Sequence, residues 1–245
     1  MNMKSKLRFI VVFFYIIIIH ININALSYVV PETFKVGEHE YYLSGNIAVL
    51  VRAGYSINGE VDIPETIFYD GLEYKVGGIA SHAFSGTNVQ SIEIPNSVWF
   101  ISNGAFAGCK SLKTIFIPES VTNISFNSVN DSYHPWIEVK GLFYGCDSLL
   151  SIVVDKNNKY YDSRNGCNAI IQTRTGRLMT GCRNTVIPSS VKSIHKNAFR
   201  GCTGLERITI PGSVQTIGSY AFAGCTSLSN IEIPSSVQGM GKGVF

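Results

Sequence analysis

The stretch AFAGCTSLSNIEIPSSV, from Ala221 to Val237, occurs twice more in the chain with small changes. The earlier copies are AFRGCTGLERITIPGSV, which begins at Ala198, and AFAGCKSLKTIFIPESV, which begins at Ala105. A fixed interval of 23 residues separates successive IP pairs, and this is typical of repeat arrays in which every copy is one structural unit. The prolines with this spacing are Pro95 and Pro118, and then Pro188, Pro211 and Pro234.

Each unit predicts one coil that contains a short strand. In SLxxIxIP the two Ile residues alternate, so they point to one face, and the Pro ends the strand because it cannot donate to the ladder. The SVxxI segment then returns, and xxAFxGC forms a tight turn or a short helix. One coil cannot bury its own apolar residues, whereas stacked coils can, at about 1.5–3 kcal/mol for each fully buried side chain. We therefore predict a β-rich repeat solenoid.

The repeated Cys is interpreted as a small buried residue of the turn and not as a nucleophile. It recurs at the same place in four units, after the Gly of the turn. The opening stretch is therefore a structural unit. These cysteines are Cys109, Cys146, Cys202 and Cys225.

The pattern AFxGCxSLxxIxIPxSVxxI resembles the BspA-like leucine-rich repeat family, which is found in surface proteins of host-associated bacteria and of some parasitic protists. The resemblance covers the chain from about Tyr41 to its end. It implies a right-handed leucine-rich repeat coil with short strands and short helical turns. It also implies a secreted or cell-surface protein with a role in adhesion or host interaction, and it supplies no ligand.

The first 25 residues have the parts of a secretory signal peptide. A basic start precedes the short apolar run FIVVFFYIIII, and Ala25 offers a small residue for cleavage. The alternative is a membrane anchor, which needs about 20 apolar residues. Losing the three basic residues of this segment leaves 17 basic and 17 acidic side chains. A net charge near zero disfavours nucleic acid or anionic lipid as a partner.

Departures from the period divide the rest of the chain. Residues 26–78 are expected to form a β-rich N-terminal cap and a first degenerate repeat, and residues 79–245 the repeats. An insertion at about 126–140 brings Tyr133, His134 and Trp136 onto a loop. These side chains are candidates for contact with a protein or glycan ligand. Alternatively, Trp136 folds back and covers the coil beneath it.

A variant repeat at about 155–190 contains two strand-like runs on either side of TRTG. The runs predict a hairpin or two neighbouring solenoid strands. If the turn centres on Arg174–Thr175, Cys167 and Cys182 lie opposite each other, and an exported chain permits a disulfide between them. The alternative is that both are packing residues like the other four cysteines.

Solenoids need a polar cap over their last coil, and none is visible before Phe245. Either the chain is truncated, or this end meets another surface.

The outward positions of the predicted strands are the other candidate binding surface. Five or more strands at about 4.8 Å spacing give a face roughly 25 Å long, enough for a protein epitope or a glycan chain. The outward residues selected as ligand-binding candidates are Glu93, Thr114, Phe116, Arg207, Thr209, Asn230 and Glu232. Ser91, Ser151 and Val153 share this outward placement.

Sites for chemistry are not apparent. The chain has no CxxC, HExxH, P-loop or GxSxG motif, and its His residues lack metal-ligand spacing, so we predict no cofactor and no metal. The oxygen-rich stretch DKNNKYYDSRNG reads as turns and not as a calcium loop. The hypothesis is a non-enzymatic binding protein of the cell surface. The alternative is a structural spacer or assembly module, and a hydrolase has almost no support.

Overall fold

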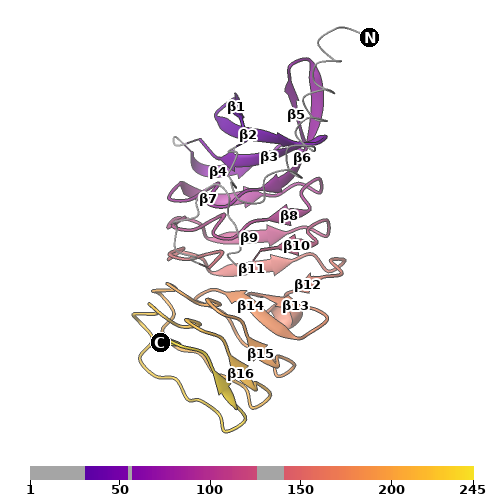
Figure 1. The fold of residues 1–245 in the computed structure, drawn as a ribbon. Helices are drawn as coiled ribbons and strands as arrows, with labels where there is room; N and C mark the ends of the chain where they lie inside the picture. Colours follow the sequence, from indigo (N-terminus) through magenta and orange to yellow (C-terminus); the bar gives the residue numbers. More distant parts are fainter. Residues whose placement is uncertain (1–30, 55–56, 126–140) are drawn as a thin grey trace, which may run out of the picture. The chain divides into compact units, whose positions relative to one another are not determined.

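The computed structural model describes residues 31–54, 57–125 and 141–245, which all belong to one compact unit. Within these ranges the chain forms 17 strands and one 3-10 helix, so the fold is built almost entirely from strands and turns. Strands of successive coils lie one above another (Figure 1). The expected signal peptide, its cleavage point at Ala25 and the three candidate residues of the insertion lie outside the described residues.

The first sheet begins with antiparallel hairpins and continues with parallel strands from successive coils. Its order is β1-β2-β3-β6-β8-β10, and β5 pairs with β6 at its side. The parallel part starts where β3 meets β6, and each later strand is the SVxxI segment of one repeat. The bounds are β1 Thr33–Val36, β2 His39–Ser44, β3 Ile47–Arg52, β5 Thr66–Tyr69, β6 Leu72–Ile79, β8 Phe100–Ile101 and β10 Asn123–Ile124.

The second sheet holds the strands that the IxIP segments predict. It is parallel throughout, in the order β11-β9-β7-β4. The alternation is as expected, because Ile92, Ile115 and Ile152 are buried and pair in register across the sheet. The bounds are β4 Asn58–Asp62, β7 Asn88–Glu93, β9 Thr114–Ile117 and β11 Ser151–Val154.

The third sheet joins the variant repeat to the last coils. Its order is β12-β13-β14-β15-β16-β17, antiparallel up to β14 and parallel after it. The variant repeat therefore contains the hairpin that was one of the two expected arrangements. The bounds are β12 Tyr161–Asp162, β13 Ala169–Gln172, β14 Arg177–Gly181, β15 Ser193–Ile194, β16 Thr216–Ile217 and β17 Gly239–Met240.

The AF segments form tight turns because each lies between two residues with left-handed backbone conformation. Asn197 has φ 59° and Gly201 has φ 69°, so only three residues separate them, too few for an α-helical turn. Short hydrogen bonds such as Cys202 N to Phe199 O, 2.9 Å, close the turn instead. The expected short helical turns are thus hydrogen-bonded turns. In the described ranges the 3-10 helix is η1, Arg164–Gly166, in the variant repeat.

The AF phenylalanines stack in a column through the core. Phe106 is fully buried, with ring centroids 5.6 Å from Phe84 and 5.7 Å from Phe143. Phe222 likewise lies 5.1 Å from Phe199 and 5.9 Å from Phe245. One ring from each coil therefore fills the space between neighbouring turns, which explains why AF recurs with the period.

The buried residues form two core clusters, and the β13–β14 hairpin contributes to both. Ile170 and Met179 belong to the first cluster, while Ile171 and Leu178 belong to the second. Neighbouring side chains of a strand point to opposite faces, so the hairpin lies between the two clusters with both faces covered. No helix in the described ranges is long and apolar enough to cross a membrane.

Candidate functional site

The outward face of the second sheet carries an exposed apolar pair. Phe116 on β9 lies directly opposite Val153 on β11, and the two side chains are 45% and 44% exposed. Their neighbours Thr114 and Ser151 also pair in register and are polar. Nearly half of each apolar side chain remains in contact with water, so a partner that covers the pair would bury apolar surface. We use the name strand face for the outward residues of β4, β7, β9 and β11.

At its β4 edge the strand face is acidic. Glu60 lies opposite Ser91, and Asp62 lies opposite Glu93, so two carboxylates face each other across neighbouring strands. Like charges in this position destabilise a sheet slightly. Glu93, one of the expected binding residues, thus sits between an acidic edge and the apolar pair. The sequence reasoning did not select Glu60 and Asp62, although GEVDIP contains the same IP signal.

The expected continuous face of five or more strands is not present, because the second sheet has four strands. Arg207 and Asn230 form only an isolated parallel bridge, and the ladder of the second sheet stops at β11. The reason is the variant repeat, in which Val186 N donates to Cys167 O and the hairpin takes the place of a regular coil. Arg207, Thr209, Asn230 and Glu232 instead line an open hollow of about 720 Å³ on the last two coils.

Three of the four repeated cysteines bond to a backbone carbonyl of the preceding coil. The thiol of Cys109 donates to Phe84 O at 3.0 Å, and the thiol of Cys146 donates to Phe106 O at 3.0 Å. Cys225 repeats this contact with Phe199 O at 3.1 Å. In the first coil Thr87 stands in the place of the Cys, and its hydroxyl donates to Phe84 O. The side chain at this position thus bonds a buried carbonyl, a structural role.

Three of these four thiols have a raised pKa, which makes them poor nucleophiles. It raises the pKa of Cys202 to about 12 and that of Cys225 to about 11. The pKa of Cys146 is also raised, first by the hydrogen bond that its thiol shares with Cys109 and then by burial. The pKa of Cys109 is instead lowered, first by its hydrogen bond with Cys146. A thiolate is the reactive form of cysteine, so the raised pKa values of the other three thiols oppose covalent catalysis there.

A thiol-labelling measurement checks this interpretation. At pH ~8 the folded chain should alkylate about a hundredfold more slowly than a free thiol at Cys225, and about a thousandfold more slowly at Cys202. In denaturant all six cysteines should react at the ordinary rate. Mass spectrometry of iodoacetamide-treated protein gives the comparison. One cysteine that labels at the free-thiol rate in the folded chain would show a reactive site.

Cys167 and Cys182 are both buried free thiols in the structure, which fits the alternative that they are packing residues and not a disulfide. A β-bulge between Ile170 and Ile171 shifts the hairpin register by one residue. Cys182 consequently bonds Asn168 O and not a position opposite Cys167. A one-residue shift reverses the face of a side chain, and the two cysteines indeed lie in different core clusters.

The oxygen-rich loop of the variant repeat uses its side chains internally. The Asp155 carboxylate accepts a hydrogen bond from Asn157 N, and the Asp162 carboxylate pairs with the Arg164 guanidinium. Asn158 is buried, and its amide bridges this loop to the coil before the insertion. Within the described residues no group of three His, Cys, Asp or Glu side chains could hold a metal ion.

The model of the BspA type leucine rich repeat region matches residues 77–172 and 179–245, in six copies. This chain belongs to the BspA-type leucine-rich repeat family. Among solved structures, the T. pallidum leucine rich repeat protein is 25% identical with a TM-score of 0.51, over 87% of this chain and 88% of that one. A search of curated proteins found no match.

Two further bacterial structures were found in the same comparison with this BspA-type chain. The Bacteroides ovatus leucine-rich repeat protein is 25% identical with a TM-score of 0.49, over 85% of this chain and 55% of that one. The pneumococcal vaccine antigen PcpA is 16% identical with a TM-score of 0.41, over 87% of this chain and 78% of that one.

Sequence reasoning missed exposed apolar residues of the BspA-type coils outside the IxIP pattern. Trp99 is 46% exposed and packs edge-on against Phe100, at a centroid distance of 4.7 Å. Val186 is exposed in the variant repeat, at the position before the second Ile of the coil. The outward position of Val186 could have been predicted, because TVIP contains the IP pair that marks this strand position in the other coils. No repeated residue in the sequence marks Trp99 as exposed.

Proposed function

We propose that this BspA-type protein is a non-enzymatic binding protein that recognises a macromolecule, protein or glycan, through its strand face. Leucine-rich repeat proteins of this family are typically binding scaffolds, and the similar solved structures include a pneumococcal vaccine antigen. The chain is exported by the signal peptide of residues 1–25 and acts at the cell surface or in the medium, with host matrix or host cells as partners.

The observation that carries this proposal is the Phe116–Val153 pair. Both side chains are nearly half exposed, and their direct pairing makes one apolar patch among polar neighbours. A few apolar anchors surrounded by polar residues are the usual composition of a recognition surface. Thr114 and Glu93 supply hydrogen-bonding groups beside the patch. The hollow lined by Arg207 and Asn230 lies beyond the break in the strand ladder and offers a separate contact on the last coils.

The insertion provides a second contact in this proposal. It begins shortly after β10, and its residues Tyr133, His134 and Trp136 combine aromatic rings with hydrogen-bonding groups. Aromatic side chains of this kind dominate the binding energy of many interfaces.

The test is a binding screen of residues 26–245 against matrix proteins and a glycan array. We expect saturable binding that weakens about tenfold or more in Phe116→Thr/Val153→Thr, because anchor residues contribute about 2 kcal/mol or more. Thr is compatible with the fold, since Thr209 occupies the same position of another coil. A third protein carries a Gly/Ser linker in place of residues 133–136.

The matched control is Phe68→Thr/Leu72→Thr, which removes exposed apolar side chains from the first sheet. It should bind as the unchanged protein does. Loss only in the linker variant would move recognition to the insertion. No binding by any folded variant or by the unchanged chain would overturn the proposal in favour of a structural spacer.

A further inference from the structure

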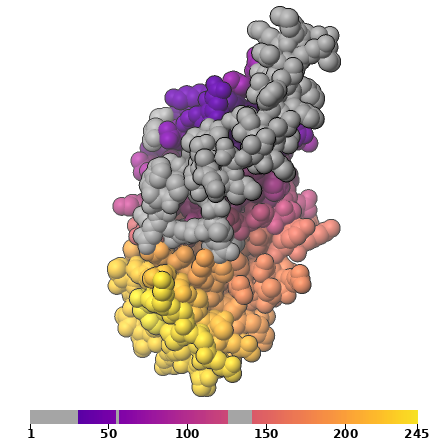
Figure 2. Space-filling model, in the orientation of Figure 1, coloured from indigo at the N-terminus to yellow at the C-terminus, as the bar shows by residue number. Residues whose placement is uncertain are grey.

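Charge is segregated along the repeat array although the net charge is near zero. Residues 31–125 carry five basic and ten acidic side chains, whereas residues 141–245 carry eleven basic and five acidic ones. The two sets occupy successive coils of the unit (Figure 2). Between Asp162 and Glu206 the chain contains seven Lys and Arg residues and no carboxylate. The C-terminal coils are therefore strongly basic, although the net charge of the whole chain is near zero.

Part of this charge gathers along the parallel strands of the third sheet. Arg177, His195 and Lys196 line an open hollow of about 430 Å³ over β14 to β17. Lys192 is exposed beside them, and its backbone N–H donates to Gly176 O next to Arg177. Lys242 stands in its coil where Lys196 stands two repeats earlier. We call these five residues the basic face.

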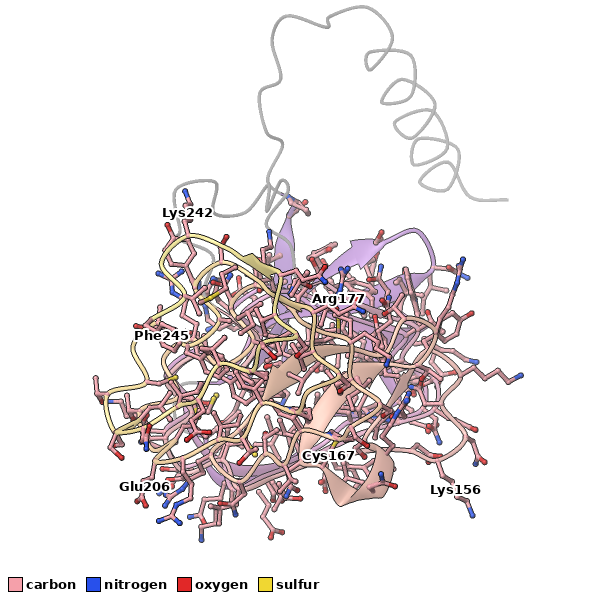
Figure 3. The ribbon with its side chains drawn as sticks, turned by 90° about the horizontal axis from the view of Figure 1, so that it is seen from below. Lys156, Cys167, Arg177, Glu206, Lys242 and Phe245 are labelled. Atoms are coloured by element: carbon pink, nitrogen blue, oxygen red, sulfur yellow. The ribbon has the colours of Figure 1, made fainter. Side chains whose placement is uncertain are left out.

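The electrostatic environment of His195 reflects these cations. Burial lowers its pKa, and the nearby charges of Arg177 and Lys196 lower it further, while the hydrogen bond to Lys196 O opposes the shift. Seen from below, Lys242 and Glu206 lie on opposite sides of the coils (Figure 3).

The surface between the cations consists mostly of small polar residues, and the described residues that line its hollow include no Phe, Tyr or Trp ring. The exposed apolar side chain that lines this hollow is Met240. Ser193, Thr216 and Gly239 form one row across the parallel strands, and Gln215 and Gln238 extend the neighbouring row that begins at Lys192. These residues offer small surfaces and hydrogen-bonding groups. A protein partner is expected to use aromatic anchors, and a nucleic acid is expected to stack its bases on them.

The aromatic ring beside Lys242 is not a free stacking surface. Tyr220 is held between two cations, with Arg200 at 5.2 Å and Lys242 at 5.7 Å from the ring centroid. Cations that approach an aromatic ring in this way compete with a stacked base or sugar. Recognition at this face therefore depends on charge and hydrogen bonds.

We propose that the basic face binds an anionic polysaccharide, whose sulfate or carboxylate groups pair with Arg177, Lys192, Lys196 and Lys242 and whose hydroxyls meet the Ser, Thr and Gln rows. Successive coils repeat at about 4.8 Å, so an extended chain that crosses them meets donors at regular intervals. Arg and Lys form their strongest hydrogen bonds with anionic oxygens. This site is distinct from the strand face and does not rest on that proposal.

The test measures binding of residues 26–245 to heparin, with hyaluronan as a carboxylate-only probe and neutral dextran as a blank. We expect saturable heparin binding that falls roughly fiftyfold between ~50 and ~200 mM salt, as about four cations release counterions. The variant Arg177→Ser/Lys192→Gln/Lys196→Ser should bind about tenfold or more weakly. Each new residue is already present at the same position of the next coil, as Ser193, Gln215 and Ser219.

The matched control removes three exposed cations elsewhere, as Lys110→Thr/Lys113→Ser/Lys156→Ser, and should keep its heparin affinity within about twofold. Lys156 lies far from Lys242 in Figure 3. Equal loss in both variants, salt-independent binding, or no heparin or hyaluronan binding by the unchanged protein would overturn the proposal. Equal affinity for single-stranded DNA would also overturn it. The Phe116→Thr/Val153→Thr protein should bind heparin normally, which separates this site from the strand face.

A second readout does not depend on affinity. The proton resonances of the His195 ring report its pKa, which should rise when heparin binds because an anion offsets the charges of Arg177 and Lys196. The pKa should also rise in the triple variant without heparin. An unchanged His195 titration in the bound state would place the polysaccharide elsewhere and contradict the assignment.

Discussion

Replacing Phe106 with alanine should lower the free energy of unfolding by about 3–5 kcal/mol, the usual cost of removing a buried phenylalanine. Phe106 is fully buried in the middle of the first phenylalanine column, between Phe84 and Phe143. The neighbouring rings cannot move into the cavity that the substitution leaves, because the turns of their own coils hold them in place. Urea unfolding followed by circular dichroism measures the change.

The same substitution at Phe245 is the matched control. Phe245 also belongs to a column, but it lies at the column's end, where its ring stacks on Phe222 and the side chain is 58% exposed. Its replacement should cost less than about 1 kcal/mol. Similar costs at the two positions would show that the stacked columns do not hold the coils together. Repeat proteins can unfold in parts, so both the midpoint and the slope of the urea transition should be compared between each variant and the unchanged protein.

Replacing Asn158 with alanine should cost about 2–4 kcal/mol. Its amide nitrogen donates to Pro118 O and Val121 O, both at 2.9 Å, while its oxygen accepts from the backbone N–H groups of Tyr160 and Tyr161. Alanine leaves these four backbone groups without that partner, and each unpaired buried group costs about 1–3 kcal/mol before water or local shifts relieve it. Thermal unfolding detects the loss.

The control for this prediction is Asn157→Ala, one residue away. The Asn157 side chain is exposed, and the local turn uses only its backbone N–H, which donates to Asp155. We expect a change within about 0.5 kcal/mol. Equal effects of the two substitutions would mean that the loop does not depend on the Asn158 bridge between the variant repeat and the coil before the insertion.

The regular part of the fold was predictable because one physical requirement repeats. Each coil must bury the same apolar positions against its neighbours. The burial of Ile115 and Phe106 could therefore be predicted from the apolar residues at the same positions of the other coils. The outward placement of Phe116 and Thr114 follows from strand alternation alone. The buried, structural place of Cys109 also follows, because a residue repeated in four turns does not mark a single active site.

The variant repeat was only partly predictable. Its apolar runs indicated a hairpin, but the bulge beside Ile170 depends on how β13 and β14 pack between two cores, which no short-range pattern specifies. That bulge places Cys167 and Cys182 on different faces. The missing helical turns have a local cause that the letters do not reveal, since Asn197 and Tyr220 adopt positive φ where a glycine would be expected.

The candidate sites were the least predictable, because they depend on neighbours brought together by stacking. The strand face was expected to run through all coils, yet the variant repeat interrupts it between Val153 and Arg207. For the basic face, stacking has the opposite effect and brings residues together. Its cations are dispersed along the sequence, and only the parallel register of β14 to β17 brings Arg177 and Lys196 to one hollow.

Hydrogen–deuterium exchange of residues 26–245, with and without the matrix protein or glycan found in the binding screen, tests the central claim most directly. The account predicts that the ligand slows exchange in peptides of β7, β9 and β11, around Phe116 and Val153. The buried turns that contain Cys109 and Cys146 should not change. Slowed exchange confined to the first sheet or to the turns, with β9 and β11 unaffected, would contradict the strand face as the recognition surface.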